Sequence, residues 1–286
     1  MPIDPAIAIG AELPAVNFTW TASDVQLYHL GVGAGARPLE PRELRYLDDA
    51  TPQVLPTFAT VVASIHATEA PRVSFPGVEI DLAKVVHGSQ EVAVHQPIPA
   101  QGSGTTITRI AEVWDKGKAA VIVQESVTTD SDGAPLWTAR SSIFARGEGG
   151  FGGERGPSAS IPLPDRAPDH EVDVPTLPQQ ALLYRMCGDR NPLHSDPEFA
   201  SAAGFRAPIL HGLCTYGIVC KAAVDAALDG DATRVGRFGA RFAGIVQPGE
   251  TLRVLIWEDE GRLLISASVP ARDDSPALAD VVLTLA

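Results

Sequence analysis

The loop after a short helical pattern in the second half of the chain carries a carboxylate and an imidazole close together. The stretch LLYRMCGDRNPLHSDP places Asp189 and His194 five positions apart, just beyond the predicted end of a helix. Gly188 permits the chain to turn and Pro192 stiffens the loop, so both side chains can face one pocket. A neutral imidazole can exchange a proton near pH 7, and a carboxylate can orient a water molecule. The pair is therefore a candidate water-activating device.

Two other interpretations of this loop remain open at the level of residue types. In the first, Asp189 caps backbone N–H groups and His194 is a partly buried side chain with satisfied hydrogen bonds, since Asp, Asn and Pro are ordinary loop residues. In the second, Asp189, His194 and Asp196 bind a metal ion, although the set lacks a further nitrogen or sulfur ligand. The motif alone does not separate these alternatives.

A glycine at the start of the longest helical pattern adds a candidate anion-binding element. In PILHGLCT, Gly212 begins a helical pattern that runs from His211 to Leu228. The first turn of a helix has N–H groups without intrahelical partners, so it can hold a developing negative oxygen, and glycine allows a substrate to come close. The alternative is a glycine needed only for packing. The loop and this helix start together fit addition of water across an α,β-unsaturated carbonyl, because one moves protons and the other holds the enolate oxygen.

The elements that position these residues occur twice in the chain, as self-similarity in the sequence shows. QLYHLGVGAGARPLE, near the N-terminus, resembles the beginning of the second-half loop when the two LY pairs are aligned. Gly33 then lies opposite Asp189, and Pro38 lies opposite His194. One copy therefore carries both ionisable side chains and the other carries neither.

Further elements follow in the same order in both halves. Short helices are predicted at residues 21–30, with Ser23 and Gln26 as a capping pattern, and after Thr176, where Gln179 completes the same pattern. Longer helices and strands come next, at 56–67, 91–99 and 111–127 in the first half and at 211–228, 241–252 and 254–269 in the second. The 56–67 helix is the weaker pattern because β-branched residues interrupt it.

A segment dense in Gly, Pro and Ser, residues 147–168, separates the two halves. Such composition is typical of a connection between compact units, so we expect a first domain at 1–146 and a second at 169–286. Each has the pattern of an α+β unit with an antiparallel sheet packed on a helix. Because such a sheet leaves a bare edge, the two copies can pair their edges as an internal dimer.

The composition bounds the class of protein. The chain has 286 residues, 45% of them hydrophobic, and a formal net charge of −13, which argues against nucleic acid as a partner. No apolar run is long enough for a membrane span and no export signal begins the chain, so a cytoplasmic location is expected. The 3 cysteines form no CxxC and fit reduced, buried thiols.

The signature LYRMCGDRNPLHSDPEFASAAGFRAPILHGLCTYG, residues 183–217, closely resembles the hydratase 2 group of the MaoC-like hot-dog proteins. This group includes the (R)-specific enoyl-CoA hydratase unit of peroxisomal multifunctional enzyme type 2. The resemblance extends to DLAKVVHGSQEVAVHQPIP, VWDKGKAAVI, GGFGGERG and ARFAGIVQPGETL. It implies a double hot-dog fold, in which each half wraps a curved sheet around a long helix. It also implies reversible hydration of trans-2-enoyl-CoA to (3R)-3-hydroxyacyl-CoA without a metal or redox cofactor.

The resemblance implies roles for individual residues. Asp189 and His194 match the catalytic pair, Asn191 matches the asparagine that orders their loop, and Gly212 matches the glycine whose N–H binds the thioester oxygen. Four further positions match contacts to the acyl-CoA: His87, Gly88, Lys116 and Phe242. Two departures are Cys187, where serine is common, and Glu154, which replaces a lysine and weakens the case that its loop binds CoA phosphates.

Two other functions remain open beside the hydratase. One is a dehydratase of fatty-acid or polyketide synthesis, which runs the same chemistry in reverse on a carrier-protein thioester. The other is a non-catalytic acyl-CoA-binding protein, which the retained acid/base loop disfavours. The resemblance further implies that the N-terminal copy gave up chemistry and makes room for a long or bulky acyl chain. We expect a homodimer, and the C-terminal VVLTLA lacks a peroxisomal ending of the SKL type.

Overall fold

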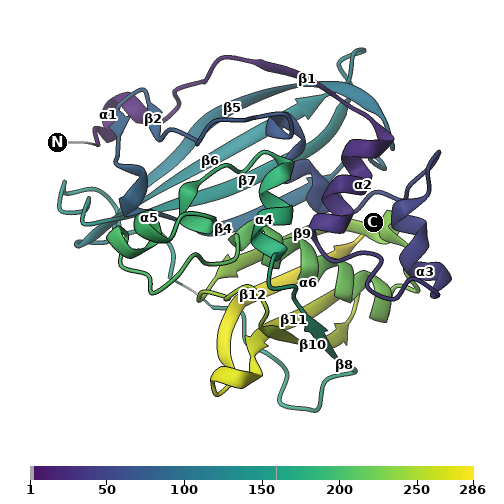
Figure 1. Cartoon of the computed structure of the whole chain (residues 1–286). Helices are drawn as coiled ribbons and strands as arrows, with labels where there is room; N and C mark the ends of the chain where they lie inside the picture. The colour runs from purple at the N-terminus through teal and green to yellow at the C-terminus, as the bar shows by residue number, and fades with distance from the viewer. Residues whose placement is uncertain (1–2, 159) are drawn as a thin grey trace.

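The computed structural model describes residues 3–158 and 160–286, and its main feature is one antiparallel sheet of 10 strands. The strands lie in the order β1-β5-β6-β7-β4-β9-β12-β11-β10-β8 (Figure 1). The first half supplies β1 (Val16–Trp20), β4 (Val85–Val94), β5 (Gly102–Asp115), β6 (Ala119–Thr129) and β7 (Pro135–Arg146). The second half supplies β8 (His170–Pro175), β9 (Val235–Phe242), β10 (Thr251–Asp259), β11 (Arg262–Val269) and β12 (Ser275–Leu285). A separate hairpin joins β2 (Ser74–Phe75) to β3 (Val78–Glu79).

The two halves meet at the centre of this sheet, where β4 pairs with β9. The pairing runs from Ser89 opposite Arg241 to Ala93 opposite Arg237. Both strands begin earlier than predicted and end before the Gln-Pro pairs at Gln96 and Gln247. The expected edge-to-edge pairing of two sheets is confirmed, and it leaves β1 and β8 as the outer strands.

The helices are short except for one. They are α1 (Pro5–Ala8), α2 (Ala22–Gly31), α3 (Pro41–Leu44), α4 (Gln180–Tyr184), α5 (Pro197–Ala202) and α6 (Gly212–Ala227). Thr21 and Asp24 form the capping box of α2, two residues before the predicted Ser23 and Gln26. Before α4, Thr176 does not cap the helix, because its hydroxyl donates to the Glu250 carbonyl instead.

The predicted long helix of the second half is confirmed as α6. Its residues from Cys214 to Val224 are all buried, and it packs against β8, β9, β10 and β12. Gly217 is needed within it because a Cβ there would lie 2.6 Å from the Tyr28 hydroxyl of the first half. The helix is therefore fitted between the C-terminal part of the sheet and the N-terminal α2.

The predicted helix at 56–67 is wrong. This segment forms two short 3-10 turns, at Pro56–Thr60 and Val62–Ser64, separated by Val61 with φ −120°. Four β-branched residues within nine positions lose side-chain freedom in a helix, which disfavours a continuous one. The described residues of the first half therefore contain no long helix, in contrast to the expectation of one in each repeat.

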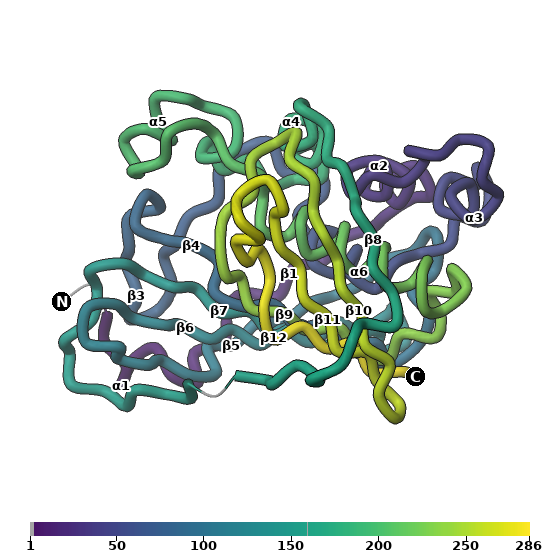
Figure 2. The backbone as a smooth tube through the Cα atoms, turned by 90° about the horizontal axis from the view of Figure 1, so that it is seen from below, coloured from purple at the N-terminus to yellow at the C-terminus, as the bar shows by residue number. Residues whose placement is uncertain are grey.

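The connection at 147–168 contains no helix or strand in its described residues. It passes from the end of β7, near the centre of the sheet, to β8 at the outer edge (Figure 2). On its way the N–H of Ile161 donates to Asp280 on β12 at 2.9 Å. The segment thus follows the sheet surface rather than standing away from it.

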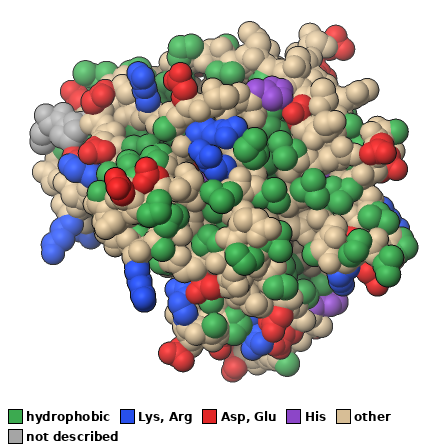
Figure 3. Space-filling model, viewed as in Figure 1, with side chains coloured by type: hydrophobic (Ala, Val, Ile, Leu, Met, Phe, Trp, Pro, Cys, Tyr) green, Lys and Arg blue, Asp and Glu red, His purple; other side chains and the backbone are tan. Residues whose placement is uncertain are grey.

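Charged side chains cover the molecule in a mixed pattern. On the face shown in Figure 3, Lys and Arg side chains stand among Asp and Glu side chains rather than forming one basic surface. Ion pairs are frequent, as Arg253 illustrates by contacting Asp173 at 2.9 Å and Glu171 at 3.2 Å. In the described part of the chain, no helix is long and apolar enough to cross a bilayer.

Candidate active site

The loop between α4 and α5 is fixed by a glycine that touches the first half of the chain. Gly188 ends the 3-10 turn Arg185–Cys187 with φ +100°, a conformation that other residues avoid. A Cβ at this position would collide with the backbone carbonyl of Ser64. The two halves therefore meet directly beneath the loop, and only glycine allows the chain to turn there.

Asn191 orders the loop through its own short turn. Its side-chain oxygen accepts the N–H of Leu193 at 3.0 Å and thereby caps the 3-10 turn Pro192–His194. Its backbone N–H donates to a carboxylate oxygen of Asp189 at 3.2 Å. Asn191 thus connects the Asp189 side chain to the turn that carries His194.

The two ring nitrogens of His194 have different surroundings, since Nδ1 is hydrogen-bonded to the backbone and Nε2 faces a cavity. Its Nδ1 lies 2.9 Å from the carbonyl oxygen of Ile209, so Nδ1–H donates and Nε2 carries the lone pair. Burial lowers the pKa of His194 below its ordinary value, while the nearby Asp189 charge opposes that shift. The imidazole is therefore neutral near pH 7 and can accept a proton.

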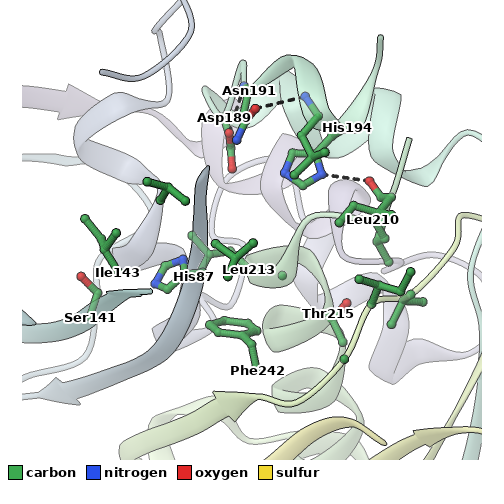
Figure 4. Close-up of a pocket in the computed structure, with 18 of the residues that line it drawn as sticks. His87, Ser141, Ile143, Asp189, Asn191, His194, Leu210, Leu213, Thr215 and Phe242 are labelled. Carbon is green, nitrogen blue, oxygen red and sulfur yellow. Dashed lines mark hydrogen bonds between the residues drawn. The ribbon is translucent and has the colours of Figure 1, made fainter. Parts of the chain in front are cut away.

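Asp189 and His194 converge on one point (Figure 4). A carboxylate oxygen of Asp189 and ring nitrogens of His194 and His211 all lie within 4.8 Å of one another. A hydrogen bond spans about 2.8 Å, so one water molecule can contact both the carboxylate and the imidazole. Asp196 is elsewhere, because its carboxylate accepts the N–H groups of Glu198 and Phe199 and caps α5. The metal set proposed from residue types is therefore not assembled.

Gly212 brings the start of α6 to the same cavity. As the first residue of the helix, it has an N–H without an intrahelical acceptor. A Cβ on Gly212 would lie 3.0 Å from two carbons of the Phe242 ring. The start of α6 therefore packs closely against the Phe242 ring, and a side chain at position 212 would press on that ring.

The cavity has a volume of about 470 Å³ and is built from both halves. The second half contributes the loop, the start of α6 and the segment 242–246. The first half contributes a largely apolar wall: Pro71, Val73, Leu82, Val85, Val86, His87, Gln124, Ser141 and Ile143. Of the residues predicted from the sequence, this cavity brings together Asp189, Asn191, His194, Gly212, His87 and Phe242.

His87 and Phe242 face each other across the junction of the two halves, with ring centroids 4.8 Å apart. Burial lowers the pKa of His87 to about 4, and its Nε2 is buried without a hydrogen-bond partner in the described structure. Gly88 does not line the cavity. It sits where β4 slips its register against β7, and a Cβ there would lie 2.6 Å from the Ser142 hydroxyl.

Lys116 also lies outside this cavity, in the turn between β5 and β6. Its Nζ donates to the Pro157 carbonyl at 3.0 Å and lies 5.3 Å from the centre of the Trp114 ring. The neighbouring Asp115, to which the sequence analysis gave no role, holds the glycine-rich loop that contains Gly150 and Gly152. N–H groups of Gly150, Gly117 and Gly152 donate to its carboxylate and lower its pKa to about 2.

One buried residue at this site was not predicted. His211 stacks on His194, with ring centroids 3.8 Å apart and an interplanar angle of 27°. The sequence offered one signal for it, namely an imidazole directly before Gly212 at the start of the longest helix. An isolated histidine at a helix start does not reveal a stacking partner, because His194 approaches it from a distant loop.

The comparisons with known proteins agree with this geometry. Residues 18–147 match the model of the MFE-2 hydratase 2 N-terminal domain, and residues 160–270 match the MaoC like domain. The chain is 61% identical over 283 residues to enoyl-CoA hydratase ChsH3 of Mycobacterium tuberculosis, covering 99% of both chains. The chain belongs to the hydratase 2 branch of the MaoC-like family. As a member of this family, it is a hydro-lyase.

Two further relatives bear on this hydratase 2 protein. It is 41% identical to 3-hydroxyacyl-thioester dehydratase Y of Mycobacterium tuberculosis, over 97% of this chain and 95% of that protein. Its structure matches full-length peroxisomal multifunctional enzyme type 2 of Drosophila melanogaster with a TM-score of 0.79 and 30% identity. That match covers 95% of this chain and 48% of the fly protein. The predicted double hot-dog fold, of the α+β class, is confirmed.

Proposed function

We propose that this hydratase 2 protein catalyses reversible hydration of trans-2-enoyl-CoA to (3R)-3-hydroxyacyl-CoA in the cavity between its two halves. One observation carries the proposal: a carboxylate, a neutral imidazole and a free helix N–H all border the same space. A protein that only bound acyl-CoA would have no use for this combination. The R configuration of the product follows from the family resemblance.

In the proposed reaction, a water molecule lies between Asp189 and His194. The water oxygen forms a bond to C3 of the substrate, one water O–H bond breaks, and a proton reaches C2 on the same face as the C2–C3 double bond is lost. The Gly212 N–H holds the thioester oxygen while negative charge develops on it. Because the two ionisable groups contact one water, the proton belongs to the pair rather than to a single acid or base.

We propose that the acyl chain extends along the first-half wall of the cavity. In this region β4, β6 and β7 present side chains to the cavity, and no long helix among the described first-half residues fills the space. Residues 1–146 would then serve as the repeat that accommodates the acyl chain, 147–168 as a connection, and 169–286 as the catalytic repeat. His87 and Phe242 would contact the thioester region, while contacts of Gly88 and Lys116 with CoA remain predictions.

A dehydratase acting on another thioester is the second candidate, favoured by the 41% identity to 3-hydroxyacyl-thioester dehydratase Y. The chemistry is the same reaction in reverse, so the site residues keep their roles. The two candidates differ only in the group that carries the acyl chain. Comparing rates on CoA and carrier-protein forms of one acyl group separates them.

The decisive experiment follows the ultraviolet absorbance of the conjugated enoyl thioester after mixing it with the protein. The hydratase predicts fading absorbance and a (3R)-3-hydroxyacyl-CoA product by chiral analysis, without added metal or redox cofactor. Binding of enoyl-CoA with unchanged absorbance would instead show a non-catalytic binder. A panel of enoyl-CoAs differing in chain length and bulk then defines the preferred acyl group.

Assembly and location remain predictions. We propose a homodimer, which light scattering during size-exclusion chromatography tests by showing the mass of two chains. We also propose a cytoplasmic location, which fractionation of the native cells tests.

A further inference from the structure

His211 lies where the three parts of the proposed site meet. Its carbonyl accepts the first hydrogen bonds of α6, and the next residue is Gly212. Its ring stacks on that of His194, and its Nε2 lies 3.3 Å from the backbone oxygen of Asp189. One residue therefore contacts the imidazole, the loop with the carboxylate and the helix start.

The hydrogen bonds give the two stacked rings different proton positions. His211 faces a carbonyl oxygen through Nε2, so Nε2–H donates and its Nδ1 is unprotonated. This Nδ1 is buried and has no hydrogen-bond partner among the described residues. His194 donates through Nδ1–H to Ile209, which leaves its Nε2 for the cavity. Each ring is thus held by a different backbone carbonyl.

The surroundings of His211 keep it uncharged. The groups that face it are the rings of His194 and Tyr184, the Arg185 side chain, and both the backbone carbonyl and the carboxylate of Asp189. A carboxylate oxygen of Asp189 lies within 4.8 Å of a ring nitrogen of His211. Burial is the largest influence and lowers the pKa of His211 well below its ordinary value, and positive charge on His194 or Arg185 lowers it further. A proton released from water therefore does not pass to His211.

We propose that His211 is a positioning residue that holds the His194 ring and the Asp189 loop in register with the Gly212 N–H. The inference rests on the proposed hydratase reaction. His211 is fully buried and does not line the cavity, so it touches no reacting atom and acts through its neighbours. Its ring covers one face of His194, and its N–H anchors the loop that carries the carboxylate.

Three variants separate the two contacts. His211→Ala removes both the ring and the donor, His211→Gln keeps a donor of similar reach, and His211→Phe keeps the ring face. Without the ring, His194 becomes better hydrated and its pKa rises toward about 6.5. We therefore expect the acidic limb of the pH profile of kcat to move to higher pH in the Ala and Gln variants and to stay in place in the Phe variant.

We also expect kcat of His211→Ala to fall about tenfold or more while KM changes less than about threefold, because misplacement of an acid/base pair affects the chemical step. Tyr184→Phe is the matched control, since it removes a buried hydroxyl without a hydrogen-bond partner from the adjacent ring. Its kcat and its acidic limb should match those of the unaltered protein.

A His211→Ala variant with kcat within about twofold of the unaltered protein and an unmoved acidic limb would overturn the inference. Asp189→Asn is measured beside it. If the unaltered protein binds enoyl-CoA without hydrating it, the proposed function itself fails. If the unaltered protein is active and Asp189→Asn is inactive while His211→Ala is unaffected, only the inference about His211 fails.

If His211→Ala does not fold, nitrogen NMR of the imidazoles in the unaltered protein provides an independent test. We expect His211 to carry its proton on Nε2 alone, and His194 on Nδ1 when neutral, between about pH 5 and 8. A second proton on His211 within this range, or a proton on its Nδ1, would contradict the arrangement.

Discussion

The two halves of the sheet share one strand order but differ in the loop and the helix that the strands hold. The order β1-β5-β6-β7-β4 in the first half is mirrored by β8-β10-β11-β12-β9 in the second. The second half adds an acid/base loop and a helix of 16 residues, whereas the first half has Gly33, Pro38 and two 3-10 turns at these places. The two halves thus share one scaffold, whereas the loop with the ionisable pair and the long helix lie in the second half.

A second crevice lies near the place that the internal repeat relates to the catalytic cavity. The crevice has a volume of about 260 Å³ and is lined by Ala286 and by residues of three segments, 52–56, 94–98 and 232–235. When Gln96 is aligned with Gln247, the segment 94–98 corresponds to 245–249, which includes Ile245 and Val246 of the catalytic cavity. A repeated fold therefore creates two places for a site, and only one has both an ionisable loop and a helix start.

Two buried imidazoles, His29 in the first half and His194 in the second, differ in the hydrogen bonds of their ring nitrogens. In His29, Nδ1 lies 2.8 Å from the Tyr46 carbonyl and Nε2 accepts the N–H of Leu55 at 3.2 Å, so both nitrogens are occupied. In His194 only Nδ1 is occupied. A neutral imidazole with two backbone partners stabilises the fold, whereas one with a free nitrogen toward a cavity can transfer a proton.

The largest effect should come from the acid/base pair. We expect Asp189→Asn and His194→Ala each to lower turnover by about 10²-fold or more with little change in folding, a size usual for acid/base groups. The matched control is His95→Ala, which removes the imidazole of the second crevice and should leave turnover unchanged. Steady-state hydration rates provide the measurement, and full activity in either site variant would contradict the assignment.

Gly188→Ala should cause the next largest effect, on stability. The added Cβ meets the Ser64 backbone, and the residue must also keep a positive φ. We expect a loss of at least about 3 kcal/mol in the free energy of unfolding, because buried backbone must shift. Gly33→Ala is the comparison in the first half, with a positive φ but open space around it, and should cost only about 1–2 kcal/mol. Equal losses in denaturant titrations would disprove the tight contact.

Acid should destabilise the protein through His29. Burial lowers the pKa of His29 to about 4, whereas the unfolded chain has an ordinary value near 6.5, so the unfolded state binds this proton first as pH falls. The stability from the neutral imidazole is complete above about pH 6.5 and is lost as pH falls toward 4, with about 2 kcal/mol lost between about pH 7 and 5. His29→Gln should reduce this pH dependence, as measured by denaturant unfolding at both pH values; an unaltered dependence would exclude His29 as its source.

The smallest effect should come from narrowing the two cavities. Val86→Phe adds bulk to the first-half wall of the catalytic cavity and should lower kcat/KM for long-chain enoyl-CoA about tenfold relative to a short-chain one. Thr233→Phe adds the same ring to the second crevice. It should not change kcat/KM for the long-chain substrate relative to the short-chain one. If both variants act alike on both substrates, the acyl chain does not use the first-half wall.

Local patterns predicted much of the fold. The hairpins at 111–127 and 254–269 are β5–β6 and β10–β11, each with its turn near a glycine, at Gly117 and Gly261. The apolar run of α6 was also recognisable. The 56–67 segment was predicted wrongly because its apolar content fits either a helix or a pair of packed 3-10 turns. The segment packs against α6, which already fills the adjacent core, and this long-range contact favours the turns.

The candidate site was partly predictable for the same reason. Asp189, His194 and Gly212 were found because a loop and a helix start are short, local features with characteristic residues. Asp115 and His211 were not, since their importance lies in partners far along the chain. Asp115 binds Gly150 and Gly152, and these contacts exist only after β5 and β7 have paired with β6.

The sequence by itself determined the order of elements, the acid/base loop, the helix start and the asymmetry between the two copies, because each depends on neighbouring residues alone. Only the tertiary structure decided that β4 joins β9, that His211 stacks under His194, and that the apolar wall of one half faces the ionisable groups of the other. These outcomes depend on burial and register between distant segments, and such long-range packing leaves no periodic signal in the chain.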